Sequence, residues 1–151
     1  MSKSGISIDL TGKVAFVTGG SLGMGFGIAR TLLRCGAKLA ICSNDQKSLD
    51  EAVQALKKFG EVLAINADVA EMDAMQRAVQ ATAEHFGGLD ILVNSAGIQR
   101  YGTIVDTEEN VWDDVMNVNL KGIFCASKFA IPEMEKRGGG AIINIASVQA
   151  Y

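Results

Sequence analysis

A glycine-rich stretch near the start of the chain constrains the fold more than any other feature. Residues 18–25 read TGGSLGMG, after the apolar run VAFV and before a segment, 26–33, whose apolar residues have helical spacing. Glycines let the backbone turn tightly and approach a ligand closely, and the helix that follows presents unpaired N–H groups and a partial positive charge. A strand, a glycine turn and a helix in this order predict a phosphate cradle, and hence a dinucleotide-binding domain.

The rest of the chain alternates short β-rich runs with longer helical ones. Strands are predicted at 13–18, 38–42, 61–66, 90–94 and 141–146, and helices near 24–35, 46–59, 70–86 and 108–137. The strands are nearly continuous in apolar residues, which is typical of strands buried on both faces. The predicted fold class is therefore α/β: one Rossmann-type domain over residues 1–151, with a doubly wound parallel sheet that stops after the fifth strand.

Local signals place the core faces and the helix ends. Two apolar stripes at helical spacing predict core faces, one formed by Met75, Val79, Thr82 and Phe86 and the other by Leu49, Val53 and Leu56. Asn44 or Asp45 is expected to cap the second helix, and Gly87 with Gly88 to end the third. Asp68 and Glu71 have the spacing of a capping box, so Asp68 could start the third helix.

Composition and charge exclude several classes of function. The chain has 151 residues, 48% hydrophobic and 21% charged, with a net charge of −3. Without a basic block we expect no nucleic-acid partner, and Lys57-Lys58 and Lys136-Arg137 are expected on solvated helix faces. No apolar run approaches a membrane span. Three scattered cysteines and one histidine, His85, favour a cytoplasmic protein without a metal site.

Five motifs, in order along nearly the whole chain, resemble those of the short-chain dehydrogenase/reductase family. They are Thr18-Gly19-x-x-x-Gly23-x-Gly25, Asp68-Val69, Asn94-Ser95-Ala96-Gly97, Asn117-Val118-Asn119-Leu120-Lys121-Gly122 and Ile143-Asn144-Ile145-Ala146-Ser147. Ser95 departs from the family's usual second Asn. The resemblance implies cofactor contacts from Gly19, Ser21, Leu22, Gly23, Met24, Gly25, Ser43, Asn44, Asp68, Val69, Asn94, Ala96 and Gly97. Asn94 could also tie loop backbone to the sheet.

The resemblance also implies a reaction: hydride transfer between NAD or NADP and a small alcohol or carbonyl substrate. Ser147 would hold the substrate oxygen, and the helix around Asn119 would support a proton-relaying water. Asn is a poor residue for a helix interior, so Asn119 predicts a kink there. In the family a tyrosine exchanges the proton; its ordinary pKa of about 10 is lowered by a nearby lysine and the oxidised nicotinamide.

The Tyr-x-x-x-Lys element of the family does not occur in these 151 residues. The family's tyrosine follows the serine by about a dozen positions, whereas Tyr151 follows Ser147 by four. We therefore interpret Tyr151 as the start of the loop after the fifth strand. We expect these residues to be part of a longer enzyme, homo-oligomeric when complete, and to be inactive alone.

The sequence leaves two questions open: whether the cofactor is NAD or NADP, and whether the chain belongs to an enzyme. An Asp at the end of the second strand would favour NAD, but Ser43-Asn44 stands there, and neither Asn44 nor Leu22 supplies a cation for NADP. Lys47 could reach a 2′-phosphate, so both cofactors stay open. The alternatives to an enzyme are a non-catalytic dinucleotide-binding module and an inactive fragment. Gln99, Arg100 and Tyr101 border the predicted site and are candidates for substrate contact.

Overall fold

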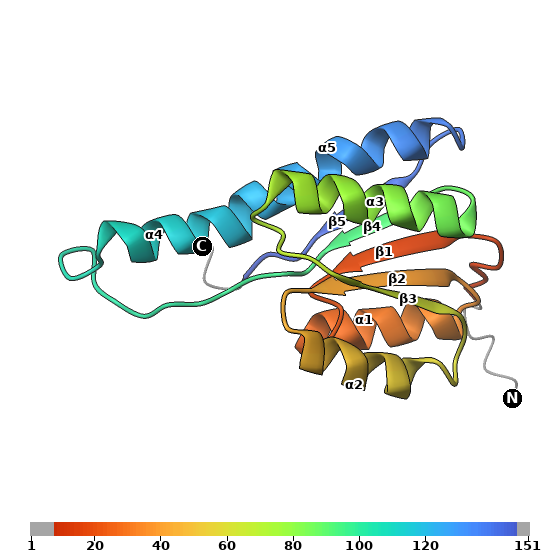
Figure 1. The fold of residues 1–151 in the computed structure, drawn as a ribbon, viewed down its shortest axis with the longest axis horizontal. Helices are drawn as coiled ribbons and strands as arrows, with labels where there is room; N and C mark the ends of the chain where they lie inside the picture. Colours follow the sequence, from red (N-terminus) through yellow and green to blue (C-terminus); the bar gives the residue numbers. More distant parts are fainter. Residues whose placement is uncertain (1–7, 148–151) are drawn as a thin grey trace, which may run out of the picture.

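Five parallel strands form one sheet in the order β3-β2-β1-β4-β5 (Figure 1). The strands are β1 (Val14–Thr18), β2 (Lys38–Ser43), β3 (Val62–Asn66), β4 (Ile91–Asn94) and β5 (Ala141–Asn144). This computed structural model describes residues 8–147, and all neighbouring strands in it pair in parallel. The predicted doubly wound parallel sheet is confirmed.

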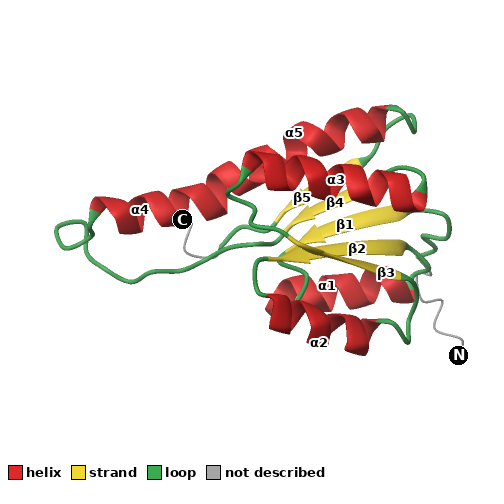
Figure 2. Cartoon of the chain, in the orientation of Figure 1, coloured by secondary structure: helices red, strands yellow, loops and turns green. Residues whose placement is uncertain are grey.

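Helices cover both faces of the sheet, as Figure 2 shows. On one face lie α1 (Gly23–Arg34) and α2 (Gln46–Leu56), and on the other α3 (Met72–Phe86) and α5 (Gly122–Glu135). Successive residues of β1 enter opposite cores: Phe16 packs on the α3 and α5 side, and Val17 on the α1 and α2 side. This alternation explains why β1 is buried at every position and apolar at its first four.

The predicted core stripes are confirmed. On α3, Met75, Val79, Thr82 and Phe86 are all buried. On α2, Leu49 and Leu56 are buried and Val53 packs against the same core. Asp45 caps α2, because its carboxylate accepts hydrogen bonds from the backbone N–H groups of Lys47 and Ser48. Gly87 ends α3 in the left-handed conformation, with a φ of 84°.

Two helices differ from the expectations that the sequence raised. The capping box does not form: α3 begins at Met72, and the carboxylate of Asp68 instead accepts a hydrogen bond from the Ala70 N–H at 2.9 Å. The helix predicted at 108–137 is interrupted. It consists of α4 (Glu109–Met116), a π-helical turn η1 (Asn117–Lys121) and α5. The kink expected at Asn119 therefore exists, as a π-turn, a feature frequent at functional sites.

The sheet's outer strands differ from the prediction of strands buried on both faces. All four residues of β5 are exposed, because no described strand lies on its outer side. β5 also ends at Asn144 rather than at residue 146. β3, at the other edge, contains only half-buried and exposed residues. β1 and β2 at the centre are almost entirely buried.

A partly buried ion pair, with its carboxylate in the interior, ties the elements together at the amino ends of the strands. The Asp90 carboxylate accepts hydrogen bonds from the Val14 N–H at 2.8 Å and from the Arg137 Nε at 3.0 Å, and Lys13 approaches it at 3.5 Å. Arg137 also donates to the carbonyl oxygen of Gly87. Arg137 is exposed, as predicted, but it lies beyond the end of α5, and its side chain reaches back to this carboxylate.

Across residues 8–147, no helix combines the length and the apolar character that a membrane crossing requires.

Candidate functional site

The loops that follow four of the strands meet at one edge of the sheet and enclose a cavity of about 290 Å³. Its lining residues are Gly19, Ser21, Leu22, Gly23, Cys42, Ser43, Asn44, Ala67, Asp68, Val69, Ser95, Ala96, Gly97, Ile98 and Val118. They lie at or just after the carboxyl ends of β1, β2, β3 and β4, or, in one case, belong to η1. In open α/β sheets this crevice is where ligands bind.

The glycine turn exists because the backbone leaves no space for side chains there. Gly19 adopts a φ of 64°, and a Cβ on it would lie 2.7 Å from the Cα of Ala96. A Cβ on Gly25 would overlap the carbonyl oxygen of Gly19. These two glycines bring the start of α1 under the turn and bring the loops after β1 and β4 into contact.

The start of α1 is suited to an anion. Its N-cap residue, Leu22, makes no side-chain cap, and its first turn holds no acidic residue. Gly23, with a φ of 55°, has open space where a side chain would stand. Unpaired N–H groups and the positive end of the helix dipole therefore face the cavity, which fits the pyrophosphate of a dinucleotide.

The ends of β2 and β3 are linked by polar side chains. The Asn44 side-chain amide donates to the Asp68 carboxylate at 3.4 Å. The Ser43 hydroxyl oxygen accepts from the Asp45 N–H at 3.2 Å. Cys42 also lines the cavity, but burial raises the pKa of its thiol to about 12. Cys42 is therefore a neutral thiol near pH 7 and not a nucleophile.

Thr18 positions the loop after β4, a role that the sequence did not reveal. Its hydroxyl oxygen accepts hydrogen bonds from the backbone N–H groups of Ser95 at 3.1 Å and Ala96 at 3.2 Å. Thr18 stands opposite Asn94 in the register of β1 and β4. A threonine at the last position of β1 indicates this role only when β1 and β4 are known to be neighbours in the sheet.

The sequence left open that Asn94 ties loop backbone to the sheet, but the described hydrogen bonds of its side chain go to other side chains. Its side chain is buried and donates to the side-chain oxygen of Asn144 at 2.8 Å and to the Ser127 hydroxyl at 3.4 Å. It therefore joins β4 to β5 and α5. Within residues 8–147 its own carbonyl oxygen, Oδ1, is buried without a hydrogen-bond partner.

A second cavity, of about 670 Å³, shares the wall formed by residues 95–98 with the first. Its lining residues are Met24, Asn94, Ser95, Ala96, Gly97, Ile98, Gln99, Arg100, Val115, Asn119, Ile123, Asn144, Ile145, Ala146 and Ser147. Both predicted catalytic residues, Asn119 and Ser147, thus face one space. Tyr101 is absent from this lining and is 88% exposed.

Asn119 acts on the loop through its side chain. Its Oδ1 accepts from the Ile98 N–H at 2.8 Å, and its Nδ2 donates to the Ile98 carbonyl oxygen at 2.9 Å. The amide pairs with Ile98 as a backbone segment would. The π-turn at η1 is the local structure that carries this side chain to the loop.

All but one of the predicted site residues line one of the two cavities. Gly25 lines neither cavity, because it is buried in the first turn of α1 under Gly19. Met24 lines the second cavity. No group of three or more potential metal ligands occurs among the described residues.

The doubly wound parallel sheet, the glycine turn and the cleft at the strand ends define an α/β protein with a Rossmann-type fold. The family model described as short chain dehydrogenase matches residues 13–151. The chain belongs to this family.

Several relatives are similar over almost the whole chain. Dehydrogenase/reductase SDR family member 4 of Oryctolagus cuniculus is 37% identical, with 100% of this chain and 60% of the relative aligned. An uncharacterized oxidoreductase of Thermotoga maritima is 39% identical over 94% of this chain and 56% of its own. A crystal structure provisionally assigned as a short-chain alcohol dehydrogenase of Sinorhizobium meliloti matches with a TM-score of 0.91 and 37% identity, over 96% of this chain and 58% of its own. This chain spans a little over half the length of these relatives.

Proposed function

We propose that the chain supplies the cofactor-binding part and two active-site residues of an oxidoreductase. The reaction is hydride transfer between NAD or NADP and a small alcohol or carbonyl compound. One observation carries the proposal: a cavity at the glycine turn and a cavity holding Ser147 and Asn119 share the wall at residues 95–98. A dinucleotide lying along this wall would place its adenosine in the first cavity and its nicotinamide in the second.

The first cavity would hold the adenosine and pyrophosphate. The pyrophosphate fits the uncapped start of α1 at Gly23, and the adenosine fits the space beside Asp68 and Val69. Once bound, the cofactor supplies or accepts hydride at C4 of its nicotinamide ring.

The second cavity would hold the substrate. The Ser147 hydroxyl can donate a hydrogen bond to a substrate oxygen, which orients the carbon that gains or loses hydride. Asn119 keeps the loop at Ile98 in place and thereby shapes this cavity. Proton exchange requires a further group, and we propose that a Tyr-x-x-x-Lys element of a longer chain supplies it.

Assembly and location are also proposals. α4, η1 and α5 expose apolar side chains, including Leu120, Phe124 and Ile131. Exposed apolar patches mark interaction surfaces, so we propose a homo-oligomer that buries this face. We propose a cytoplasmic location, without nucleic-acid, membrane or metal partners.

The proposed function is tested by measuring nicotinamide absorbance while the full-length protein is mixed with NAD(P) and a panel of alcohols and carbonyl compounds. We expect turnover from the full-length protein, and cofactor binding without turnover from residues 1–151. Ser147→Ala should lower kcat/KM by about a hundredfold. Thr31→Ala, on the exposed face of α1, removes a hydroxyl remote from both cavities and should leave it unchanged. A full-length protein that binds cofactor but turns over none of the panel favours the non-catalytic alternative.

A further inference from the structure

The second cavity has one charged side chain among its described lining residues, and that charge is positive. Arg100 contributes the guanidinium group, and every other lining side chain is apolar or neutral and polar. Arg100 does not line the first cavity, where the pyrophosphate would bind. The positive charge therefore borders the space that we assign to the substrate, and not the phosphates of the cofactor.

The loop that carries Arg100 is anchored by a residue of the same cavity. The Asn119 side chain pairs with both backbone polar groups of Ile98, two residues before Arg100. One guanidinium N–H of Arg100 donates to the carbonyl oxygen of Gln99 at 3.1 Å, so the side chain lies along its own loop. A guanidinium has five N–H donors in a planar fork, and this bond uses one of them. The others are suited to an acceptor that enters the cavity.

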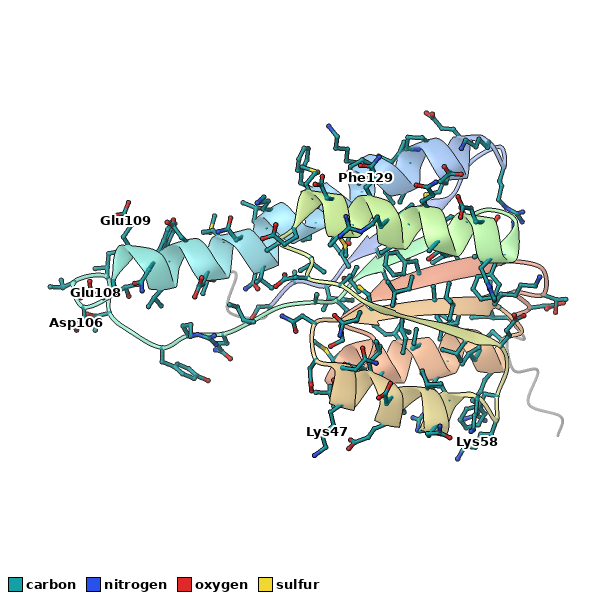
Figure 3. All side chains as sticks on the ribbon, in the orientation of Figure 1. Lys47, Lys58, Asp106, Glu108, Glu109 and Phe129 are labelled. Carbon is teal, nitrogen blue, oxygen red and sulfur yellow. The ribbon has the colours of Figure 1, made fainter. Side chains whose placement is uncertain are left out.

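The charge of Arg100 is not balanced from within the described residues. No carboxylate among them forms an ion pair with Arg100. The next acidic residues along the chain, Asp106, Glu108 and Glu109, do not line the cavity, and Figure 3 shows them at the end of α4 that is remote from the sheet. Arg100 is itself exposed, so it lies at the edge of the cavity, where an anion from solvent can reach it.

We propose that Arg100 binds a carboxylate of the substrate, and that the enzyme therefore acts on a hydroxy acid or the corresponding oxo acid. This inference rests on the proposed function and narrows its substrate class. In the oxidation, the carbon that bears the hydroxyl loses hydride to the oxidised cofactor, and the hydroxyl proton passes to the proton-exchanging group of the longer chain. The carboxylate is unchanged and serves only to position the substrate.

The chemistry of the cavity favours a carboxylate over a phosphate. A guanidinium can bind a carboxylate through two parallel N–H···O bonds, which fixes its orientation as well as its position. The single cation of the described lining matches the single charge of a carboxylate. A phosphate monoester would bring close to two negative charges to the same cation.

The test is turnover by the full-length protein, supplied with NAD or NADP, of three matched sets of compounds. These are hydroxy acids of four to six carbons with one or several hydroxyl groups, their methyl esters, and hydroxyalkyl phosphates of the same lengths. We expect the best acid to have a kcat/KM at least about tenfold above that of its ester. Arg100→Gln should raise KM for the acid by about tenfold or more, with kcat and the Kd for the reduced cofactor changed by less than about twofold. Arg100→Lys, which keeps the charge but not the planar fork, should retain part of the preference.

A matched control is Arg77→Gln. Arg77 is exposed on α3 and lines neither cavity, so this variant should keep the parent's preference for acids. Esters or phosphates turned over as well as the acids overturn the inference and leave the proposed function standing. Cofactor binding without turnover of any acid also overturns the inference, and a preference for acids that survives Arg100→Gln overturns the role of Arg100. Binding of neither NADH nor NADPH contradicts the proposed function itself.

Discussion

Two side chains, those of Thr18 and Asn119, form hydrogen bonds with backbone groups of the loop after β4. The Thr18 hydroxyl accepts from two successive N–H groups, and the Asn119 amide pairs with both polar groups of Ile98. The loop forms the wall between the two cavities. A loop lacks the regular backbone hydrogen bonds of a strand or helix. Hydrogen bonds from side chains such as these therefore determine where its backbone lies.

Thr18→Val keeps the shape of the side chain and removes the acceptor. The N–H groups of Ser95 and Ala96 then lose their partner beside a buried strand end, so the free energy of unfolding should fall by about 1–3 kcal/mol. Urea unfolding measures the change. Thr31→Val, on the exposed face of α1, should change stability by less than about 0.5 kcal/mol. Equal effects from the two variants would contradict the positioning role of Thr18.

At the scale of elements, α1 contains glycines of opposite character. Gly25 lies under the glycine turn, where a Cβ would overlap the Gly19 carbonyl oxygen. Gly27, two residues further along the same helix, has no neighbour within 4 Å of the Cβ position. Only the first is required by the shape of the cradle.

Gly25→Ala should therefore cost about 1–3 kcal/mol of stability and weaken dinucleotide binding, because the turn must shift. Gly27→Ala should leave binding unchanged and stabilise the protein by about 0.5–1 kcal/mol, because alanine is the better helix residue. Thermal unfolding and a titration with NADH measure both. If Gly25→Ala binds NADH as the parent does, the tight approach of α1 to the turn is not needed.

The sequence predicted the elements well where the signal is local. The strands of the sheet, the cap at Asp45 and the kink at Asn119 each follow from neighbouring residues, and the structure has all three. The roles of Thr18 and Arg137 depend on strands and helices that are distant in sequence. No local pattern carries that information, and Asp68 failed as a helix cap because its carboxylate is committed to the loop and to Asn44.

Across the whole molecule, the two ends of the sheet have different tasks. The carboxyl ends of the strands hold the cleft, where glycines and an uncapped helix leave polar groups available. The amino ends hold Asp90, whose bonds to Val14 and Arg137 join β1, β4 and the segment after α5. Burial opposes the charge of Asp90, but these partners and Lys13 outweigh it and lower the pKa of the carboxyl below its ordinary 3.8.

This lowered pKa makes stability depend on pH. Because the folded state favours the charged carboxylate, the contribution of Asp90 is complete above pH 3.8 and is lost as the pH falls through the lower folded pKa. Asp90→Asn should destabilise the protein by about 3 kcal/mol at pH 7. As the pH is lowered into the acid range, the free energy of unfolding of Asp90→Asn should fall by less than that of the parent. Asp113→Asn, on exposed α4, should keep the parent's pH dependence, and an identical acid slope for Asp90→Asn would contradict this account.

The central claim is that a dinucleotide lies across the two cavities at the carboxyl ends of the strands. A crystal structure of the full-length protein with NADH bound tests it most directly. The account predicts the pyrophosphate at the start of α1 beside Gly23, the adenosine beside Asp68, and the nicotinamide in the cavity of Asn119 and Ser147. A nucleotide found elsewhere, or bound with its pyrophosphate away from α1, would contradict it.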